Sequence, residues 1–101
     1  MIVRIVKMEF QPEKANDFET LFKSIKHKIV QTEGCFHLEL WRDISNQNIF
    51  FTYSKWESQF FLDQYKQTDV FKRAWPKAKS MFAKKPAAWS VKQIVVQKAS
   101  I

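Results

Sequence analysis

The sequence predicts an α+β fold in which an antiparallel β-sheet, built in the order β-α-β-β-α-β, carries its helices on one face. Two observations lead to this prediction. Strand-like segments rich in β-branched and aromatic residues alternate with segments whose apolar residues recur every three or four positions. The only glycine of the chain, Gly34, lies between the first helical segment and the strand-like segment that follows it. A residue free to adopt positive φ suits a helix end at which the chain reverses into a sheet.

The first strand and the first helix follow from the apolar pattern. Residues 2–10 are mostly β-branched or apolar, which predicts a strand. Residues 12–32 predict a helix, because Pro12 suits a first helical turn and acidic residues follow it near the positive end of the helix dipole. The apolar positions of this helix are expected in the core: Phe18, Leu21, Phe22, Ile25 and Ile29.

Two strands are expected to form a hairpin in the middle of the chain. Residues 35–43 predict a strand that turns Phe36, Leu38 and Leu40 towards the helices. Its opposite face is expected to carry Cys35, His37, Glu39 and Trp41. Residues 48–53 predict the next strand, which is apolar or aromatic on both faces and runs on towards Trp56. So small a chain cannot cover both faces of its sheet with its own helices, so the second face must meet a partner or a ligand.

The remaining elements complete the order. Ser58 is expected to begin a helix, and Thr68 to cap a second one. Pro76 predicts a kink or a break in this second helix, because proline lacks the backbone N–H that the helix needs. Residues 88–96 predict the last strand. The result is a ferredoxin-like arrangement that occupies residues 1–101 as a single domain.

Composition narrows the class of protein. No apolar stretch approaches the roughly 20 residues of a membrane span, and the first residues lack the features of a signal peptide. We therefore expect a cytoplasmic protein without a membrane partner. Its single cysteine, Cys35, cannot form an internal disulfide, which fits a reducing compartment.

The positive charge is confined to one half of the chain. Residues 1–57 hold eight Lys and Arg against eight Asp and Glu, whereas residues 58–101 hold nine against two and so carry the whole net charge of +7. Such asymmetry is compatible with two interpretations. The lysines form either the solvated face of a helix or a surface for an anionic partner.

Several short segments, in this order, resemble the antibiotic biosynthesis monooxygenase (ABM) family: Glu33-Gly34-Cys35, Arg42-Asp43 at a strand end, Trp56-Glu57-Ser58 at a helix start, and then Leu62, Tyr65, Thr68 and Phe71. The resemblance implies a dimeric α+β barrel in which the uncovered sheet faces of two copies pack together and leave apolar pockets. It also implies oxygenation of quinols, phenols or anthrones without metal or flavin. A homodimer, a small aromatic substrate or ligand, and no cofactor are thus expected.

The sequence departs from the family pattern where histidine is often found. Tyr65 precedes Thr68 at the place of a His-x-x-Ser pair, and tyrosine, with a reference pKa of about 10, is a weaker base at neutral pH. A hydrogen-bonding role for Tyr65 is unaffected. The haem-degrading branch of the family has His at the position of Trp75, Trp at that of Tyr65 and Asn near Lys7. None of these is present, so haem degradation is not expected.

His37 and Tyr65 are the candidate catalytic residues. His37 is expected to accept the proton of a phenol or quinol, whose anion then gives an electron to dioxygen. The candidate substrate-binding residues are Glu39, Tyr53, Trp56, Phe71 and Trp75. The alternative interpretation is that His37 and Glu39 belong to a hydrogen-bond network in a dimer interface and that the aromatic residues serve packing. No metal site is expected, because same-face residues of one strand lie roughly 6.5 to 7 Å apart.

Two other function classes compete with an oxygenase. RNA-recognition modules share this element order and stack bases on sheet aromatics such as Phe51 and Tyr53, but the glycine of their RNP1 pattern is missing from this strand. No nucleic-acid partner is therefore expected. The second competitor is a non-catalytic dimeric barrel that binds a ligand or acts in a stress response. Sequence does not separate binding from turnover.

Overall fold

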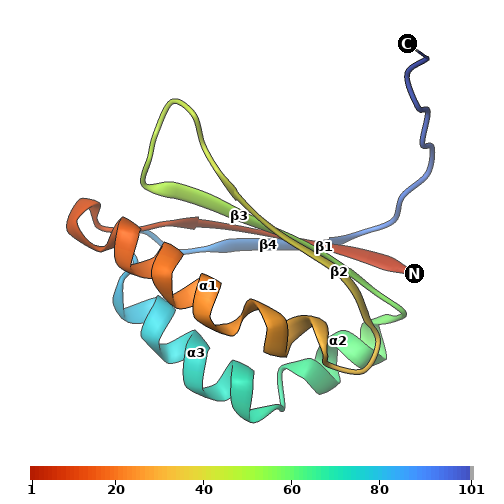
Figure 1. Cartoon of the computed structure of the whole chain (residues 1–101), viewed down its shortest axis with the longest axis horizontal. Helices are drawn as coiled ribbons and strands as arrows, with labels where there is room; N and C mark the ends of the chain where they lie inside the picture. The colour runs from red at the N-terminus through yellow and green to blue at the C-terminus, as the bar shows by residue number, and fades with distance from the viewer. Residues whose placement is uncertain (101) are drawn as a thin grey trace.

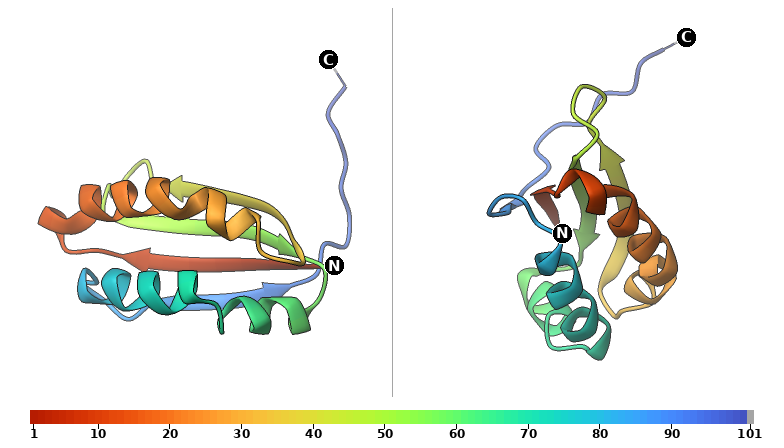
Figure 2. Two further views of the ribbon diagram at one scale, coloured as in Figure 1. Left: turned by 60° about the horizontal axis from the view of Figure 1, so that its bottom comes forward. Right: turned by 90° about the vertical axis from the view of Figure 1, so that its left-hand side faces the viewer.

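The structure, a computed structural model, describes residues 1–100. Its strands are β1 (Ile2–Glu9), β2 (Cys35–Arg42), β3 (Ile49–Trp56) and β4 (Ala87–Val91), and its helices are the 3₁₀ turn η1 (Pro12–Lys14), α1 (Ala15–Val30), α2 (Gln59–Tyr65) and α3 (Asp69–Ser80). The strands pair antiparallel in the order β2-β3-β1-β4. All helices lie on one face of this sheet, and the other face is left uncovered (Figures 1 and 2). The predicted ferredoxin-like α+β fold is confirmed.

The core lies between the sheet and α1. Phe10, Phe18 and Phe50 meet there, with ring centroids 4.2 Å apart for Phe10 and Phe18 and 5.3 Å for Phe18 and Phe50. Three of the five core positions expected on α1 are buried, namely Phe18, Phe22 and Ile29. Contacts between the aromatic rings therefore fix α1 across the sheet.

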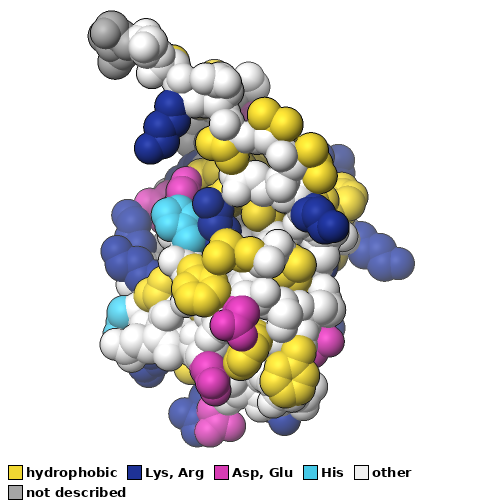
Figure 3. Space-filling model, turned by 90° about the vertical axis from the view of Figure 1, so that its right-hand side faces the viewer, with side chains coloured by type: hydrophobic (Ala, Val, Ile, Leu, Met, Phe, Trp, Pro, Cys, Tyr) yellow, Lys and Arg dark blue, Asp and Glu magenta, His cyan; other side chains and the backbone are white. Residues whose placement is uncertain are grey.

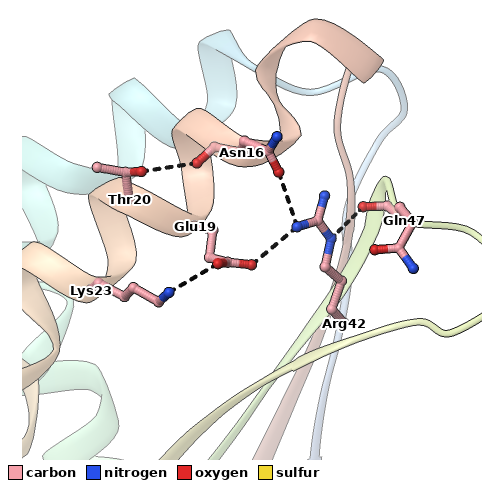
Figure 4. A network of polar contacts seen from close by, with 6 residues as sticks. All are labelled: Asn16, Glu19, Thr20, Lys23, Arg42 and Gln47. Carbon is pink, nitrogen blue, oxygen red and sulfur yellow. Dashed lines mark hydrogen bonds and ion pairs between the residues drawn. The ribbon is translucent and has the colours of Figure 1, made fainter.

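A polar network also holds α1 to the sheet, at the end of β2 (Figure 4). The Arg42 guanidinium donates to Glu19 Oε1 and to Asn16 Oδ1, each at 3.1 Å, and to the backbone carbonyl of Gln47 at 2.7 Å. It also lies 4.7 Å from the centre of the Phe50 ring. The planar guanidinium group of Arg42 thus links α1, the β2–β3 turn and the core.

Gly34 has the conformation that its position predicted. Its φ is +85°, and its carbonyl accepts a hydrogen bond of 2.8 Å from the backbone N–H of Glu57. A side chain here would also collide with α2, because an added Cβ would lie 2.4 Å from the Cβ of Phe61. Glycine is therefore required twice, once for the backbone and once for the space.

The start of β2 differs from the predicted alternation. The register shifts between Cys35 and His37, so that Cys35 lies opposite Trp56 while His37 lies opposite Lys55. This β-bulge places one extra residue, Phe36, between them. Phe36 is 56% exposed, so its predicted place under the helices is wrong. Cys35 shares the helix-facing side with Trp56 instead of the face of His37 and Glu39.

The helices after β3 are separated at the cap predicted for Thr68. The Thr68 hydroxyl oxygen accepts a hydrogen bond of 3.3 Å from the backbone N–H of Phe71 and begins α3. Pro76 does not break α3, which runs through it to Ser80. The proline removes only one N–H, and the turn that follows it is held against the core by the buried Ala78.

The last strand ends at Val91, five residues before the predicted end at residue 96. The reason lies in the pairing. Val91 is opposite Val3, and β1 begins at Ile2, so the chain beyond Val91 has almost no strand left to pair with. Residues 92–100 leave the sheet as an extended tail on the side away from the helices (Figure 1).

None of the helices in residues 1–100 combines the length and the apolar character that crossing a membrane requires.

Candidate functional site

A cavity of about 170 Å³ lies between the sheet and the helices. Its floor comes from alternate residues of the strands, and its other sides come from α1, α2 and α3. Apolar side chains make up most of the lining, among them Val6, Met8, Phe22, Ile25, Leu38 and Leu62. A mostly apolar cavity with a few polar groups is the usual form of a small-molecule site.

Aromatic side chains line one part of this cavity. Tyr65, at the end of α2, lies between Trp56 of β3 and Phe71 of α3, with ring centroids 5.0 Å and 5.3 Å away. Trp75, one helical turn after Phe71, stacks on it at 5.8 Å with the ring planes 14° apart. These four residues provide flat, polarisable surfaces on which an aromatic ligand can stack.

A row of polar residues crosses the sheet, and two of them, Arg4 and Ser54, line the cavity. Arg4 of β1 is paired with Ser54 of β3 on one side and with Ser90 of β4 on the other. Its guanidinium donates a hydrogen bond of 3.1 Å to the Ser90 hydroxyl. Ser54 is only 6% exposed, and its hydroxyl oxygen accepts a hydrogen bond of 2.9 Å from the Trp56 indole N–H.

Tyr65 is held in its neutral form. Burial, and to a smaller extent the nearby Cys35 thiol, raises the pKa of Tyr65 to about 12. Within residues 1–100 the Tyr65 hydroxyl has no hydrogen-bond partner, although it lies in the lining. A neutral phenol with a free O–H is suited to donate a hydrogen bond to a ligand oxygen, and it is unsuited to accept a proton at neutral pH.

A second set of candidate residues lies on the uncovered face of the sheet. The His37 ring pairs with the Glu39 carboxylate, which also accepts a hydrogen bond of 2.7 Å from the Trp41 indole. These two hydrogen bonds, that of His37 first, hold the pKa of the Glu39 carboxyl below its usual value. Trp41 stacks on Tyr53 at 5.1 Å. The four side chains form a continuous polar and aromatic cluster.

The sheet therefore separates the residues that the sequence singled out. Trp56, Tyr65, Phe71 and Trp75 come together around the cavity, whereas His37, Glu39 and Tyr53 lie on the opposite face. Their individual roles remain predictions.

Sequence reasoning missed Arg4 and Ser54. One signal was present in the strand pattern, because Arg4 has the same parity as Val6 and Met8, which face the helices. A charged residue is unusual among the helix-facing positions of a central strand, and its presence there calls for a structural or functional reason.

No three side chains of the types His, Cys, Asp and Glu come close enough within residues 1–100 to hold a metal ion together.

Comparison with known families identifies the fold more closely. A family model for antibiotic biosynthesis monooxygenases matches residues 1–77. The chain belongs to the ABM family. The matched part of this ABM chain contains every predicted site residue, and it includes Arg4 and Ser54 as well. The resemblance drawn from the short motifs is thus confirmed. No curated protein matches the chain.

Solved structures of similar fold agree with the ABM assignment. A conserved protein from Methanosarcina mazei Go1 superposes with a TM-score of 0.86 at 25% identity, over 93% of this chain and 94% of that one. A structure of an antibiotic biosynthesis monooxygenase gives a TM-score of 0.88 at 19% identity, over 94% and 100% of the two chains. A protein from Mycobacterium tuberculosis gives 0.84 at 12% identity, over 98% of each chain. At these identities the similarity shows the shared fold.

Proposed function

We propose that the cavity binds a small electron-rich aromatic compound, such as a quinol, a phenol or an anthrone, and that the protein oxygenates it with dioxygen and no cofactor. The observation that carries this proposal is the arrangement of Trp56, Tyr65, Phe71 and Trp75 around an otherwise apolar cavity in an ABM-family chain. These side chains offer stacking surfaces, and the surrounding apolar residues exclude water from a reactive anion.

The reaction balances without an added reductant. A quinol loses one proton to solvent, and its anion gives an electron to dioxygen, which produces a substrate radical and superoxide. The two combine to form a carbon–oxygen bond, and the resulting peroxide takes up a proton. Loss of water then leaves a hydroxyquinone, so one oxygen atom enters the ring and the other leaves as water.

Tyr65 takes the role of a hydrogen-bond donor in this proposal. Its pKa of about 12 keeps the O–H in place at neutral pH, where it donates to the oxygen of the bound ring. His37 takes no part in the step, because it lies on the other face of the sheet. Positioning of the ring against dioxygen and exclusion of water are the contributions of the remaining lining.

Oxygen uptake tests the proposal directly. The purified protein is mixed in air with hydroquinones and anthrones, and the expected result is uptake faster than in buffer, with one atom of ¹⁸O₂ in the product. Tyr65→Phe is expected to lower kcat by roughly 10- to 100-fold. Ser24→Ala, which removes an exposed hydroxyl of α1 outside the cavity, is the control, and it is expected to leave the rate unchanged. Rates equal to those in buffer across the panel would contradict the proposal.

A non-catalytic ligand-binding protein is the alternative, and the same cavity supports it. The two functions differ in one measurement. A ligand-binding protein takes up the aromatic compound, as seen by quenching of tryptophan fluorescence, without consuming oxygen. Binding without uptake would therefore favour this alternative.

The uncovered face of the sheet supports the further proposal of a homodimer. It carries large side chains that no helix covers, among them Trp41 and Trp89, which are 42% and 48% exposed. Hydrophobic side chains are also exposed at the end of the molecule from which the tail leaves (Figure 3). A second copy packed on the uncovered face of the sheet would bury Trp41 and Trp89. Stable pairs typically bury about 800 Å² per partner. In that dimer the cluster of His37, Glu39 and Trp41 is part of the interface.

A further inference from the structure

We infer that the ligand of the cavity carries an acidic oxygen that is ionised when bound, and that Arg4, together with Ser54, binds this anion. The inference rests on the proposed function and narrows its substrate class to aromatic compounds with a phenolate, enolate or carboxylate group. It also assigns a specificity-determining role to two residues of the sheet.

The charges around the cavity favour an anionic ligand. Its lining contains two cationic residues, Arg4 and Lys66, and no aspartate or glutamate. No carboxylate within residues 1–100 forms an ion pair with Arg4, whose side-chain hydrogen bond is to the neutral Ser90 hydroxyl. The half-buried Arg4 side chain thus lines an apolar cavity, and its guanidinium has only the exposed Ser90 hydroxyl as a partner. An anionic ligand supplies the missing partner.

Ser54 provides a second hydrogen-bond donor next to Arg4. It lies directly opposite Arg4 on β3, on the same helix-facing side of the sheet. Its oxygen is occupied by the hydrogen bond from the Trp56 indole N–H, so the proton of its hydroxyl remains free to donate. Arg4 and Ser54 therefore present donors from adjacent strands, and a carboxylate or phenolate oxygen accepts both kinds of bond.

This arrangement also explains how the substrate is activated although the described lining contains no histidine or carboxylate to accept its proton. A positive charge close to a phenol favours the ionised form and lowers the pKa of that phenol. The phenolate or enolate is the form that gives an electron to dioxygen, and the proton passes to solvent. Arg4 thus stabilises the reactive anion instead of removing the proton.

Binding of a matched pair of ligands tests the inference without requiring turnover. We would titrate the protein with 2-naphthoate and with its neutral analogue 2-naphthamide, and follow tryptophan fluorescence and calorimetric heat. The wild type is expected to bind the acid at least about tenfold more tightly than the amide, because a charge-assisted hydrogen bond is present only with the acid. Equal affinities would overturn the inference.

Variants then locate the anion. Arg4→Gln is expected to remove the preference for the acid and to leave the affinity for the amide within about twofold, while Arg4→Lys retains part of the preference. Arg73→Gln, on the exposed side of α3, is the matched control and is expected to change neither affinity. An unchanged preference in a folded Arg4→Gln protein would overturn the assignment. Because the wild-type comparison needs no variant, it stands even where Arg4→Gln fails to fold.

The outcome is separable from that of the proposed oxygenation. Preference for the acid without oxygen uptake supports the anion site and contradicts turnover. Oxygen uptake with equal binding of acid and amide supports turnover and overturns the anion site.

Discussion

The indole N–H of Trp56 donates a hydrogen bond of 2.9 Å to the hydroxyl oxygen of Ser54, and both residues are buried. They are two positions apart on β3 and therefore point to the same face of the sheet. The bond fixes the orientation of the indole against Tyr65, whose ring centroid is 5.0 Å away. One hydrogen bond thus positions both the aromatic lining and the polar row of the cavity.

Replacement of Ser54 by alanine is expected to destabilise the protein. Ser54→Ala leaves the buried indole N–H of Trp56 without an acceptor, which costs roughly 1 to 3 kcal/mol. The free energy of unfolding in urea measures this effect. Ser90→Ala, at an exposed position of β4, is the control and is expected to lie within about 0.5 kcal/mol of the wild type. A Ser54→Ala protein as stable as the wild type would show that the indole finds another acceptor.

The high pKa of Tyr65 predicts a loss of stability in alkaline solution. The pKa rises from 10.0 to about 12 on folding, so the contribution of Tyr65 is complete below pH 10 and is lost as the pH rises towards 12. The shift of two units corresponds to roughly 2 to 3 kcal/mol. Denaturant unfolding at a series of pH values, together with tyrosinate absorbance, follows the change. Tyr65→Phe is expected to lack this part of the pH dependence, and an identical profile would refute the assignment.

Gly34→Ala is expected to destabilise the protein by roughly 1 to 3 kcal/mol, because alanine at a φ of +85° is strained. Its Cβ also meets the Cβ of Phe61. Phe61→Ala retains that Cβ, so the double variant is not expected to recover the stability lost at Gly34. Melting temperatures of the two single variants and the double variant test this, with Glu33→Ala as an exposed neighbouring control. A recovery in the double variant would mean that the ring of Phe61 causes the clash.

The proposed dimer predicts a specific sensitivity of the uncovered face. Trp89→Glu places a charge among apolar side chains in the interface and is expected to convert the dimer into a monomer in sedimentation at micromolar concentration. Ile44→Glu is the control, since Ile44 is 93% exposed in the β2–β3 turn. A wild-type protein that sediments as a well-folded monomer would contradict the proposal.

Much of the fold was predictable because the local signals agreed with one another. The helix-spaced apolar residues of α1, the positive φ of Gly34 and the cap of Thr68 each rest on interactions within a few residues. Wherever a prediction depended on a neighbouring strand, the sequence was less informative. Phe36 is exposed because of a bulge in the pairing of β2 with β3. The order of apolar and polar residues within β2 does not predict this bulge.

The candidate site was predictable in part for the same reason. Trp56, Tyr65, Phe71 and Trp75 were selected by motif and chemistry, and the fold gathers them around one cavity. His37 was selected by its chemistry alone, and the face of β2 on which it lies removes it from that cavity.

The sequence by itself determined the order of the elements, the turn at Gly34 and the ABM family, because these depend on backbone preferences and on the spacing of apolar residues along the chain. Only the tertiary structure decided where β4 stops, since β1 offers no partner beyond Ile2. It also decided that Arg4 and Ser54 lie opposite each other and line the same apolar cavity, because that arrangement depends on the register between two strands that pair residues fifty positions apart in the chain.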